Sequence, residues 1–379
     1  MQISNSIRAL SEELIEIRRE LHRIPELGFE EVKTKEYIRN YLEKLSPDML
    51  EVGLGVKAVF WNNAEKTLAF RADIDALPIK EETGLPFSSE HDGIMHACGH
   101  DGHTAILLAF AKLVSQNRAS LKHNIVLIFQ PNEESAAGAK VLIENGILEN
   151  PKADAIYGLH IWPEFKKHQI VLKKGALMSG MDDFYITFEG KRAHGAMPQL
   201  GCDAITAAAA FITGVQSVIS RNVSPFDSAV FTVGMINGGT APNILAETVE
   251  LGCTLRAFSE KTLSFAKERI VEYAESIASA YRASVSFRKK TGGFPVVNDE
   301  NLFEHAKEFF MDADINSESM VMPSEDFCYY QREIPGLFML LGSRDEKHTA
   351  ALHSVNYILN EEILMDGVEI FRRIAEIDD

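Results

Sequence analysis

The chain contains a short stretch of residues suited to binding a metal ion, His96–His103, with the sequence HACGHDGH. Three histidines, one cysteine and one aspartate fall within it, whereas an even spread of the 12 histidines over 379 residues would place only about a quarter of a histidine in such a window. Imidazole and thiolate are ligands that borderline-soft divalent ions such as zinc prefer. A Cys-x-His pair alone is weak evidence, so the prediction depends on partners elsewhere in the chain.

Carboxylate and imidazole side chains follow several predicted strands, near the point where each strand ends. They are Asp73 after the strand 68–71, Glu133 and Glu134 after 124–129, His160 after 155–159, and His353 beyond 337–341. In a mostly parallel sheet, ligands bind outside the carboxyl ends of the strands. The sequence therefore predicts one site with five candidate metal ligands: Cys98, His100, Glu134, His160 and His353.

This donor set suits two divalent ions that lie close together, because thiolate, imidazole and carboxylate can supply both shared and terminal ligands. Cys98 is the candidate for the bridging ligand, since two cations would deprotonate its thiol. Glu134 would bind metal, and Glu133 would take a proton from the metal-bound water and pass it to a leaving amine. The Asp73 carboxylate would orient a ligand imidazole. A pair of adjacent glutamates also suits a solvated helix N-terminus, so the pair alone does not establish a base.

The hydrophobic pattern predicts an α/β fold for the part of the chain that holds these residues. Amphipathic stripes at 7–21 and 361–374 and a buried helix at 104–113 alternate with apolar strands. Such alternation predicts a mostly parallel sheet flanked by helices.

From about residue 182 the pattern changes to strand, helix, two strands, helix and strand, which is a split βαβ arrangement of the ferredoxin-like kind. The expected elements are strand 184–188, helix 203–220, strands 229–233 and 248–258, helix 260–281 and strand 284–288. We therefore expect an inserted α+β domain at 183–293. Residues 1–182 and 294–379 would form a discontinuous catalytic domain.

Composition excludes some partners. The net charge is −17, which argues against nucleic acid or an anionic membrane as a partner. The four cysteines share no close spacing and indicate no disulfide scaffold. The N-terminal residues lack a signal-peptide pattern, and no apolar run reaches the ~18 residues of a membrane span. We expect a cytoplasmic protein.

Five motifs together resemble one subfamily of two-metal metallopeptidases and amidohydrolases. It contains hippurate hydrolases, N-acetyl-diaminopimelate deacetylases, N-acyl-amino-acid hydrolases and auxin-conjugate hydrolases. The motifs are RADIDALP at 71–78, the His96–His103 stretch, QPNEE at 130–134, GLH at 158–160 and GKRAHGAMP at 190–198. The resemblance extends from about Ile17 to Ile374. The chain departs from the usual pattern at Asn132 and at 135–137, which leaves the shape of the substrate pocket open.

The resemblance implies that the inserted domain is a lid or dimerisation domain, and it supports the two-metal site and the role of Glu133 as base. His194 would stabilise the oxyanion formed on the scissile carbonyl. Asn243 would contact substrate, and Arg256 would hold a substrate carboxylate by paired hydrogen bonds. A strand-end surface arginine is an equally good interpretation of Arg256. The loop 324–327 is expected to lie behind the site.

These features predict a metal-dependent amidohydrolase that removes an N-acyl group from a small-molecule N-acyl-amino acid by attack of metal-bound hydroxide. The two divalent ions would be zinc, manganese, cobalt or nickel. The oligomer would be a homodimer or homotetramer, and an exposed lid strand edge offers a route to dimers. Three alternatives stay open. They are a dipeptidase or carboxypeptidase with the same site, a cysteine-nucleophile amidase built on Cys98, and a non-catalytic binding protein on this scaffold.

Overall fold

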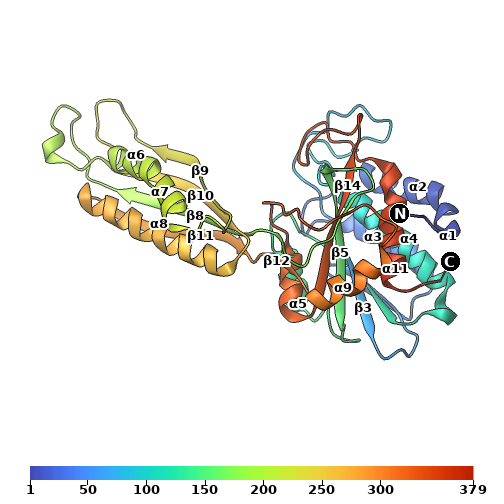
Figure 1. Cartoon of the computed structure of the whole chain (residues 1–379). Helices are drawn as coiled ribbons and strands as arrows, with labels where there is room; N and C mark the ends of the chain where they lie inside the picture. Colours follow the sequence, from blue (N-terminus) through green and yellow to red (C-terminus); the bar gives the residue numbers. More distant parts are fainter. Residues whose placement is uncertain (379) are drawn as a thin grey trace. The chain divides into compact units, whose positions relative to one another are not determined.

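The computed structural model describes residues 1–378 and divides into two compact units (Figure 1). The first, here called the catalytic unit, contains residues 1–175, 297–319 and those from 326 onward. The second, here called the inserted unit, contains residues 176–296 and 320–325. Its main boundaries lie seven and three residues outside the expected 183–293, and it also includes a short segment that the sequence pattern did not assign to it.

An eight-stranded sheet forms the centre of the catalytic unit, in the order β1-β2-β4-β3-β5-β14-β6-β13. The bounds are β1 Met49–Val52, β2 Val56–Phe60, β3 Thr67–Asp73, β4 Asn124–Gln130, β5 Ala155–Lys166, β6 Ile170–Val171, β13 Ile315–Asn316 and β14 Gly336–Arg344. The neighbouring strands β4, β3, β5 and β14 run parallel. Every residue of β2, β3 and β4 is buried, which explains their nearly continuous apolar sequences. The predicted α/β class with a mostly parallel central sheet is confirmed.

Helices flank this sheet and supply most of the remaining core. They are α1 Asn5–Arg8, α2 Ser11–Arg23, α3 Val32–Glu43, α4 His100–Gln116, α5 Gly138–Glu144, α9 Glu300–Phe309, α10 Tyr330–Glu333 and α11 Leu364–Ile374. Helix α4 packs against β3, α2 and α11, and its helical residues are buried almost throughout. The stripe expected as one helix over 7–21 is two helices, because the chain leaves the helix at Ala9 and Leu10 and starts again at Ser11.

Strand β5 is longer than the pattern 155–159 predicted, so that His160 lies within the strand and does not follow its end. The pairing with β14 continues past this point, with His160 opposite Leu340 and Ile161 opposite Leu341. Strand length was therefore set by pairing with a segment some 180 residues away, which a local pattern does not contain.

The inserted unit is a four-stranded antiparallel sheet in the order β11-β8-β10-β9, with two helical segments packed on it. The elements are β8 Gly180–Glu189, α6 Ala204–Gly214, α7 Gln216–Asn222, β9 Ala229–Gly238, β10 Thr248–Ala257, α8 Glu260–Ala280 and β11 Ser284–Gly293. This chain order and strand order are those of the predicted split βαβ, ferredoxin-like unit. The short strands β7 (Gly175–Met178) and β12 (Val296–Asn298) lie where the chain passes between the units.

Helices α6 and α7 together, from Ala204 to Asn222, are long and apolar enough to cross a membrane by length and composition alone. The sequence pattern had predicted no such segment. A core helix of a soluble domain passes the same test. In the inserted unit Ala207, Phe211 and Val215 of this segment are buried in the core against the sheet, which accounts for the apolar composition of one face.

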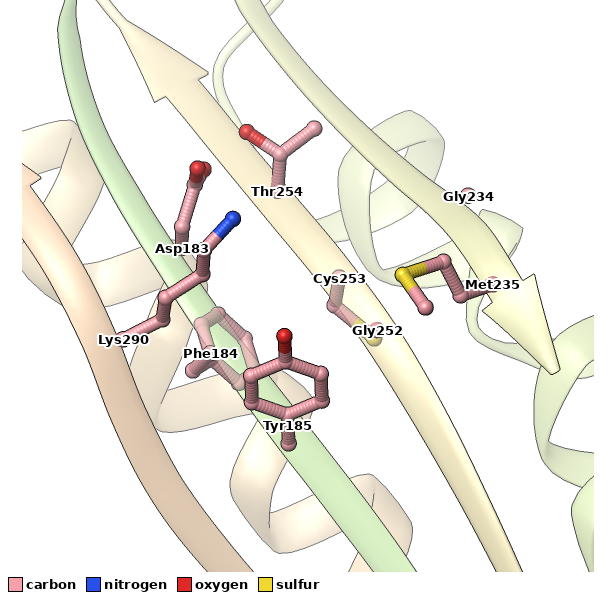
Figure 2. Close-up of a pocket in the computed structure, with 9 residues that line it drawn as sticks. All are labelled: Asp183, Phe184, Tyr185, Gly234, Met235, Gly252, Cys253, Thr254 and Lys290. Atoms are coloured by element: carbon pink, nitrogen blue, oxygen red, sulfur yellow. The ribbon is translucent and has the colours of Figure 1, made fainter. Parts of the chain in front are cut away.

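Two β-bulges occur at the same level of the inserted sheet. One interrupts the β10–β9 register at Gly252/Cys253, and the other the β11–β8 register at Lys289/Thr291. Between them lies a small pocket of about 150 Å³, with Asp183, Tyr185 and Met235 among its lining residues (Figure 2). In this view the helices lie behind the strands, so the pocket opens on the other face of the sheet.

Candidate metal centre

A left-handed glycine joins the two ligand candidates of the His96–His103 stretch. Gly99 has φ +83° and precedes helix α4, whose first residue is His100. A side chain at Gly99 would be strained in this backbone region and would also touch the Tyr357 hydroxyl, 3.3 Å from a Cβ at that position. Across this turn, Cys98 and His100 offer ligand atoms within 4.8 Å of each other.

The structure brings the five predicted ligands together. The Sγ atom of Cys98 lies 3.4 Å from Nε2 of His160 and 3.3 Å from Nε2 of His353. The Glu134 Oε1 atom lies 3.4 Å from Nε2 of His353 and 3.9 Å from Nε2 of His100. Three of these side chains are buried, whereas that of Glu134 is 15% exposed and that of His353 is 50% exposed. The catalytic unit alone therefore assembles all five donors, with one side open to a substrate.

Hydrogen bonds fix which nitrogen of each buried ligand imidazole faces the cluster. His100 Nδ1 donates to the Asp75 carbonyl oxygen at 3.0 Å, and His160 Nδ1 donates to the Ile161 carbonyl oxygen at 2.7 Å. When each ring is neutral, its Nε2 carries no proton and is directed at the other donors. Such bonds are typical of histidines that bind metal.

Two buried atoms that could bind metal have no hydrogen-bond partner among residues 1–378. They are Nε2 of His100 and Oε1 of Glu134. A buried polar atom without a partner is costly unless something else satisfies it. Burial lowers the pKa of His100, but the charges of Asp73 and Asp75 outweigh burial and raise this pKa to about 10. Burial and the charges of Glu134 and Glu133 raise the pKa of the Cys98 thiol well above its usual range. The site thus has an excess of negative charge that divalent cations would neutralise, so these residues fit a metal pair.

Two aspartates near the site contact different histidines. Asp73 Oδ1 accepts a hydrogen bond from His103 Nδ1 at 2.6 Å, and His103 Nε2 accepts one from the Ile161 amide at 2.9 Å. Both ring nitrogens of His103 are therefore engaged, and this histidine is not a candidate ligand. The imidazole that Asp73 orients is that of His103, whereas the ligand His100 is held by Asp75.

In the inserted unit, the predicted oxyanion histidine lies next to the predicted substrate residue. His194 and Ile244 form an antiparallel bridge, and the Gly195 amide donates to the Asn243 carbonyl oxygen at 2.8 Å. The Ala196 amide donates to Nδ1 of His194 at 3.0 Å. This bond leaves the proton of a neutral His194 on Nε2, the tautomer that a donor to a carbonyl oxygen needs.

Arg256 is already engaged within the inserted unit. Its Nε donates to Thr254 Oγ1 at 3.2 Å and its Nη1 donates to Ser324 Oγ at 2.7 Å. These bonds hold the guanidinium in a fixed orientation, so its role in binding a substrate carboxylate stays a prediction.

Comparison with known proteins adds a family to this geometry. A family model described as peptidase family M20/M25/M40 matches residues 69–377. The chain belongs to this family. An N-acetyldiaminopimelate deacetylase of Listeria monocytogenes (serotype 4a, strain HCC23) is 40% identical over 373 residues, which are 96% of this chain and 99% of the relative. The enzyme of the same name in Bacillus subtilis (strain 168) is 41% identical over 367 residues, 95% and 96% of the two chains.

Solved structures of M20 relatives agree with this assignment. A Bacillus subtilis protein described as a dinuclear metal-binding peptidase of the M20 family is 36% identical, with a TM-score of 0.85 over 97% of this chain and 98% of that one. A putative aminohydrolase of methicillin-resistant Staphylococcus aureus is 31% identical, with a TM-score of 0.90 over 98% of both chains. This M20 protein is accordingly a metal-dependent amidohydrolase whose cofactor is a pair of metal ions.

Sequence reasoning missed part of the surroundings of the M20 site. Asp75 entered the sequence analysis only as part of the RADIDALP motif, yet its Oδ2 accepts the Glu134 amide at 3.0 Å and its carbonyl oxygen accepts His100 Nδ1 at 3.0 Å. The loop 324–327 was expected behind the site, and Asp326 accepts hydrogen bonds from Arg71 at 3.0 Å and from Gln130 at 2.8 Å. The aspartate pair in RADIDALP was the only signal in the sequence, and it did not reveal which aspartate faces which histidine.

Proposed function

We propose that this protein removes the acetyl group from an N-acetyl-amino acid, with N-acetyl-diaminopimelate as its substrate. The observation that carries the proposal is the 40% identity to N-acetyldiaminopimelate deacetylases over 96% of the chain. All five donors and the adjacent Glu133 are present together in the catalytic unit, which argues against a non-catalytic binding protein on this scaffold.

Cys98, His100, Glu134, His160 and His353 would hold the two metal ions. When bound, the ions lower the pKa of water toward neutrality and polarise the amide carbonyl. Glu133 would act as the base. Its side chain is 9% exposed, and it offers a carboxylate oxygen within 4.8 Å of donor atoms of His100 and Glu134. Glu133 would take the proton from the attacking water and give it to the leaving amine.

The inserted unit would supply groups that act on the substrate. His194 would donate from Nε2 to the carbonyl oxygen as negative charge develops there. Asn243, held against the same loop, would contact substrate, and Arg256 would bind the substrate carboxylate with the part of its guanidinium that Thr254 and Ser324 do not use.

A substrate panel on one preparation tests the proposal. Metal-stripped protein is re-supplied in turn with zinc, manganese, cobalt or nickel, and then assayed with N-acetyl-diaminopimelate, other N-acetyl-amino acids, hippurate and unblocked dipeptides. The expected result is the highest kcat/KM on N-acetyl-diaminopimelate and no turnover without metal. Preference for unblocked dipeptides would establish a peptidase instead. Activity that survives exhaustive chelation would favour the cysteine-nucleophile amidase.

We also propose a cytoplasmic location and a dimer. All four cysteines are free thiols, which suits a reducing compartment. Strand β9 is an edge of the inserted sheet, with Met235 and Ile236 more than half exposed, and an apolar edge strand favours pairing with another chain. Cell fractionation and light scattering on the purified protein test the two proposals.

A further inference from the structure

The turn that presents the two catalytic-site glutamates is unusually tight. After β4 ends at Gln130, the backbone takes φ +55° at both Asn132 and Ala136, a region that few residues other than glycine adopt. The Ala136 amide donates to the Glu133 carbonyl oxygen at 2.6 Å, and the Gly138 amide donates to the Asn132 carbonyl oxygen at 3.1 Å. The direction of Glu133 and Glu134 therefore depends on what holds this turn in place.

A buried carboxyl group from a distant segment holds it. Glu31 Oε1 accepts the Asn132 amide hydrogen at 2.9 Å, across 101 residues of sequence. The Glu31 side chain is fully buried. The same segment is fixed beside the site, because the Ala76 amide donates to the Glu26 carbonyl oxygen at 2.8 Å.

The position of Glu31 in the sequence suggests a helix cap, and the structure excludes that role. Glu31 is the residue before helix α3, the N-cap position, where a side-chain oxygen can accept an amide of the first turn. Its side chain makes no such cap. Among residues 1–378, its second oxygen, Oε2, has no hydrogen-bond partner. The side chain is thus directed at the turn, and its bond to the Asn132 amide is the interaction to explain.

Glu31 keeps its proton to a higher pH than an exposed glutamate does. Burial and the nearby charge of Asp75 raise the pKa of Glu31 to about 7. The cost of a buried negative charge is avoided when the carboxyl keeps its proton, and its Oε1 can still accept the Asn132 amide. A glutamine has the same shape and acceptor, so it should replace Glu31.

We propose that Glu31 is a positioning residue of the metal centre, which acts through the Asn132 amide to hold the turn that directs Glu133 and Glu134. This proposal rests on the proposed roles of Glu133 as base and Glu134 as metal ligand. It predicts that the hydrogen-bond acceptor at position 31, and not its charge, determines metal affinity and kcat.

The test compares Glu31→Gln, Glu31→Leu and the control Glu30→Gln, whose side chain is on the adjacent exposed position. Each metal-stripped protein is titrated with Mn²⁺ by calorimetry, and kcat and KM are measured on N-acetyl-diaminopimelate at saturating Mn²⁺. We expect Glu31→Leu to bind Mn²⁺ about 10- to 100-fold more weakly and to lose kcat to a similar extent with KM little changed. Glu31→Gln and the control should stay within about threefold of the parent protein, since both keep the bond to Asn132.

Normal Mn²⁺ affinity and kcat in Glu31→Leu would overturn the proposal, even if its melting temperature fell. An equal loss in Glu31→Gln would also overturn it, because the acceptor would then not be the feature that matters. Should Glu31→Leu not fold, Glu31→Asp, which is one methylene too short to reach the amide, takes its place with the same expected losses. If the parent protein did not hydrolyse N-acyl-amino acids, the proposed function would fail, and the Mn²⁺ titrations would still decide the role of Glu31.

Discussion

Asp75 contacts two of the proposed ligands, and its replacement by asparagine tests how the metal centre is held. Its Oδ2 accepts the Glu134 amide at 3.0 Å, and its Oδ1 lies 3.3 Å from His100 Nδ1. Asparagine has the same shape but only one acceptor oxygen, and its NH₂ group would face one of these two N–H donors. The substitution therefore removes one charge-assisted hydrogen bond and places two donors against each other.

The size of the effect follows from the burial of Asp75, which is 1% exposed. Because water cannot replace the lost bond, we expect the full value of a hydrogen bond to a charged group, about 1.5–3 kcal/mol. At about 1.4 kcal/mol per factor of ten, metal affinity should fall about 10- to 100-fold. His100 keeps its bond to the Asp75 carbonyl oxygen at 3.0 Å, so its tautomer is retained. Saturating metal should therefore restore most of the kcat.

The assay is a Mn²⁺ titration of metal-stripped Asp75→Asn beside Asp92→Asn, whose carboxylate is 89% exposed. The control should bind Mn²⁺ as the parent protein does. Parent-like affinity in Asp75→Asn would refute the argument that this carboxylate holds His100 and Glu134 in place.

The remaining predictions concern catalysis, stability and pH. Glu133→Gln should lower kcat by about 10²- to 10⁴-fold with both metals still bound by elemental analysis, and near-normal turnover would remove Glu133 from its role. His194→Ala should lower kcat by about 10²- to 10³-fold without changing Mn²⁺ affinity, because the proposed ligands all belong to the catalytic unit; a parallel loss of affinity would contradict this. Arg71→Met should lower the free energy of unfolding by about 3–5 kcal/mol in urea titrations, since it removes the cation that pairs with two buried carboxylates, and an unchanged midpoint would show that the network does not need the charge. Mn²⁺ binding should release protons, and the affinity for Mn²⁺ should increase as pH rises through neutrality. Without metal the Cys98 thiol is protonated and the pKa of His100 is about 10, so protons compete with the ions. Equal calorimetric heats of binding in buffers of different ionisation enthalpy would contradict this prediction.

The sequence predicted what depends on local pattern and on residue chemistry. The apolar strands and amphipathic helices of both units follow from hydrophobic periodicity. The metal ligands could be selected because cysteine, histidine and glutamate supply donor atoms that divalent ions prefer, and because they fall in the His96–His103 stretch or near predicted strands. Family motifs then gave the positions of His194 and Asn243, which no local pattern in the inserted unit distinguishes from other loop residues.

What the sequence did not reveal depends on contacts between distant segments. The extension of β5 beyond His160 comes from its pairing with β14. The choice of Asp75 over Asp73 as the partner of His100 depends on how the chain bends after β3. No pattern in the sequence singled out Glu31, whose bond to the Asn132 amide joins segments 101 residues apart. These features are set by tertiary geometry, for which neither periodicity nor residue type is a sufficient signal.

Backbone hydrogen bonds between distant segments bring the ligands together, and they lower the entropic cost of binding the metal ions. The His353 amide donates to the Ala97 carbonyl oxygen and the Ile74 amide donates to that of Gln130, both at 2.9 Å. Because these bonds use no ligand side chain, the fold can position the donors before metal binds, and little ordering entropy opposes binding. The opposing cost is electrostatic, since buried carboxylates and a thiol crowd one site. Divalent cations relieve that repulsion only in the folded protein, so the metal pair should stabilise the catalytic unit as well as support catalysis.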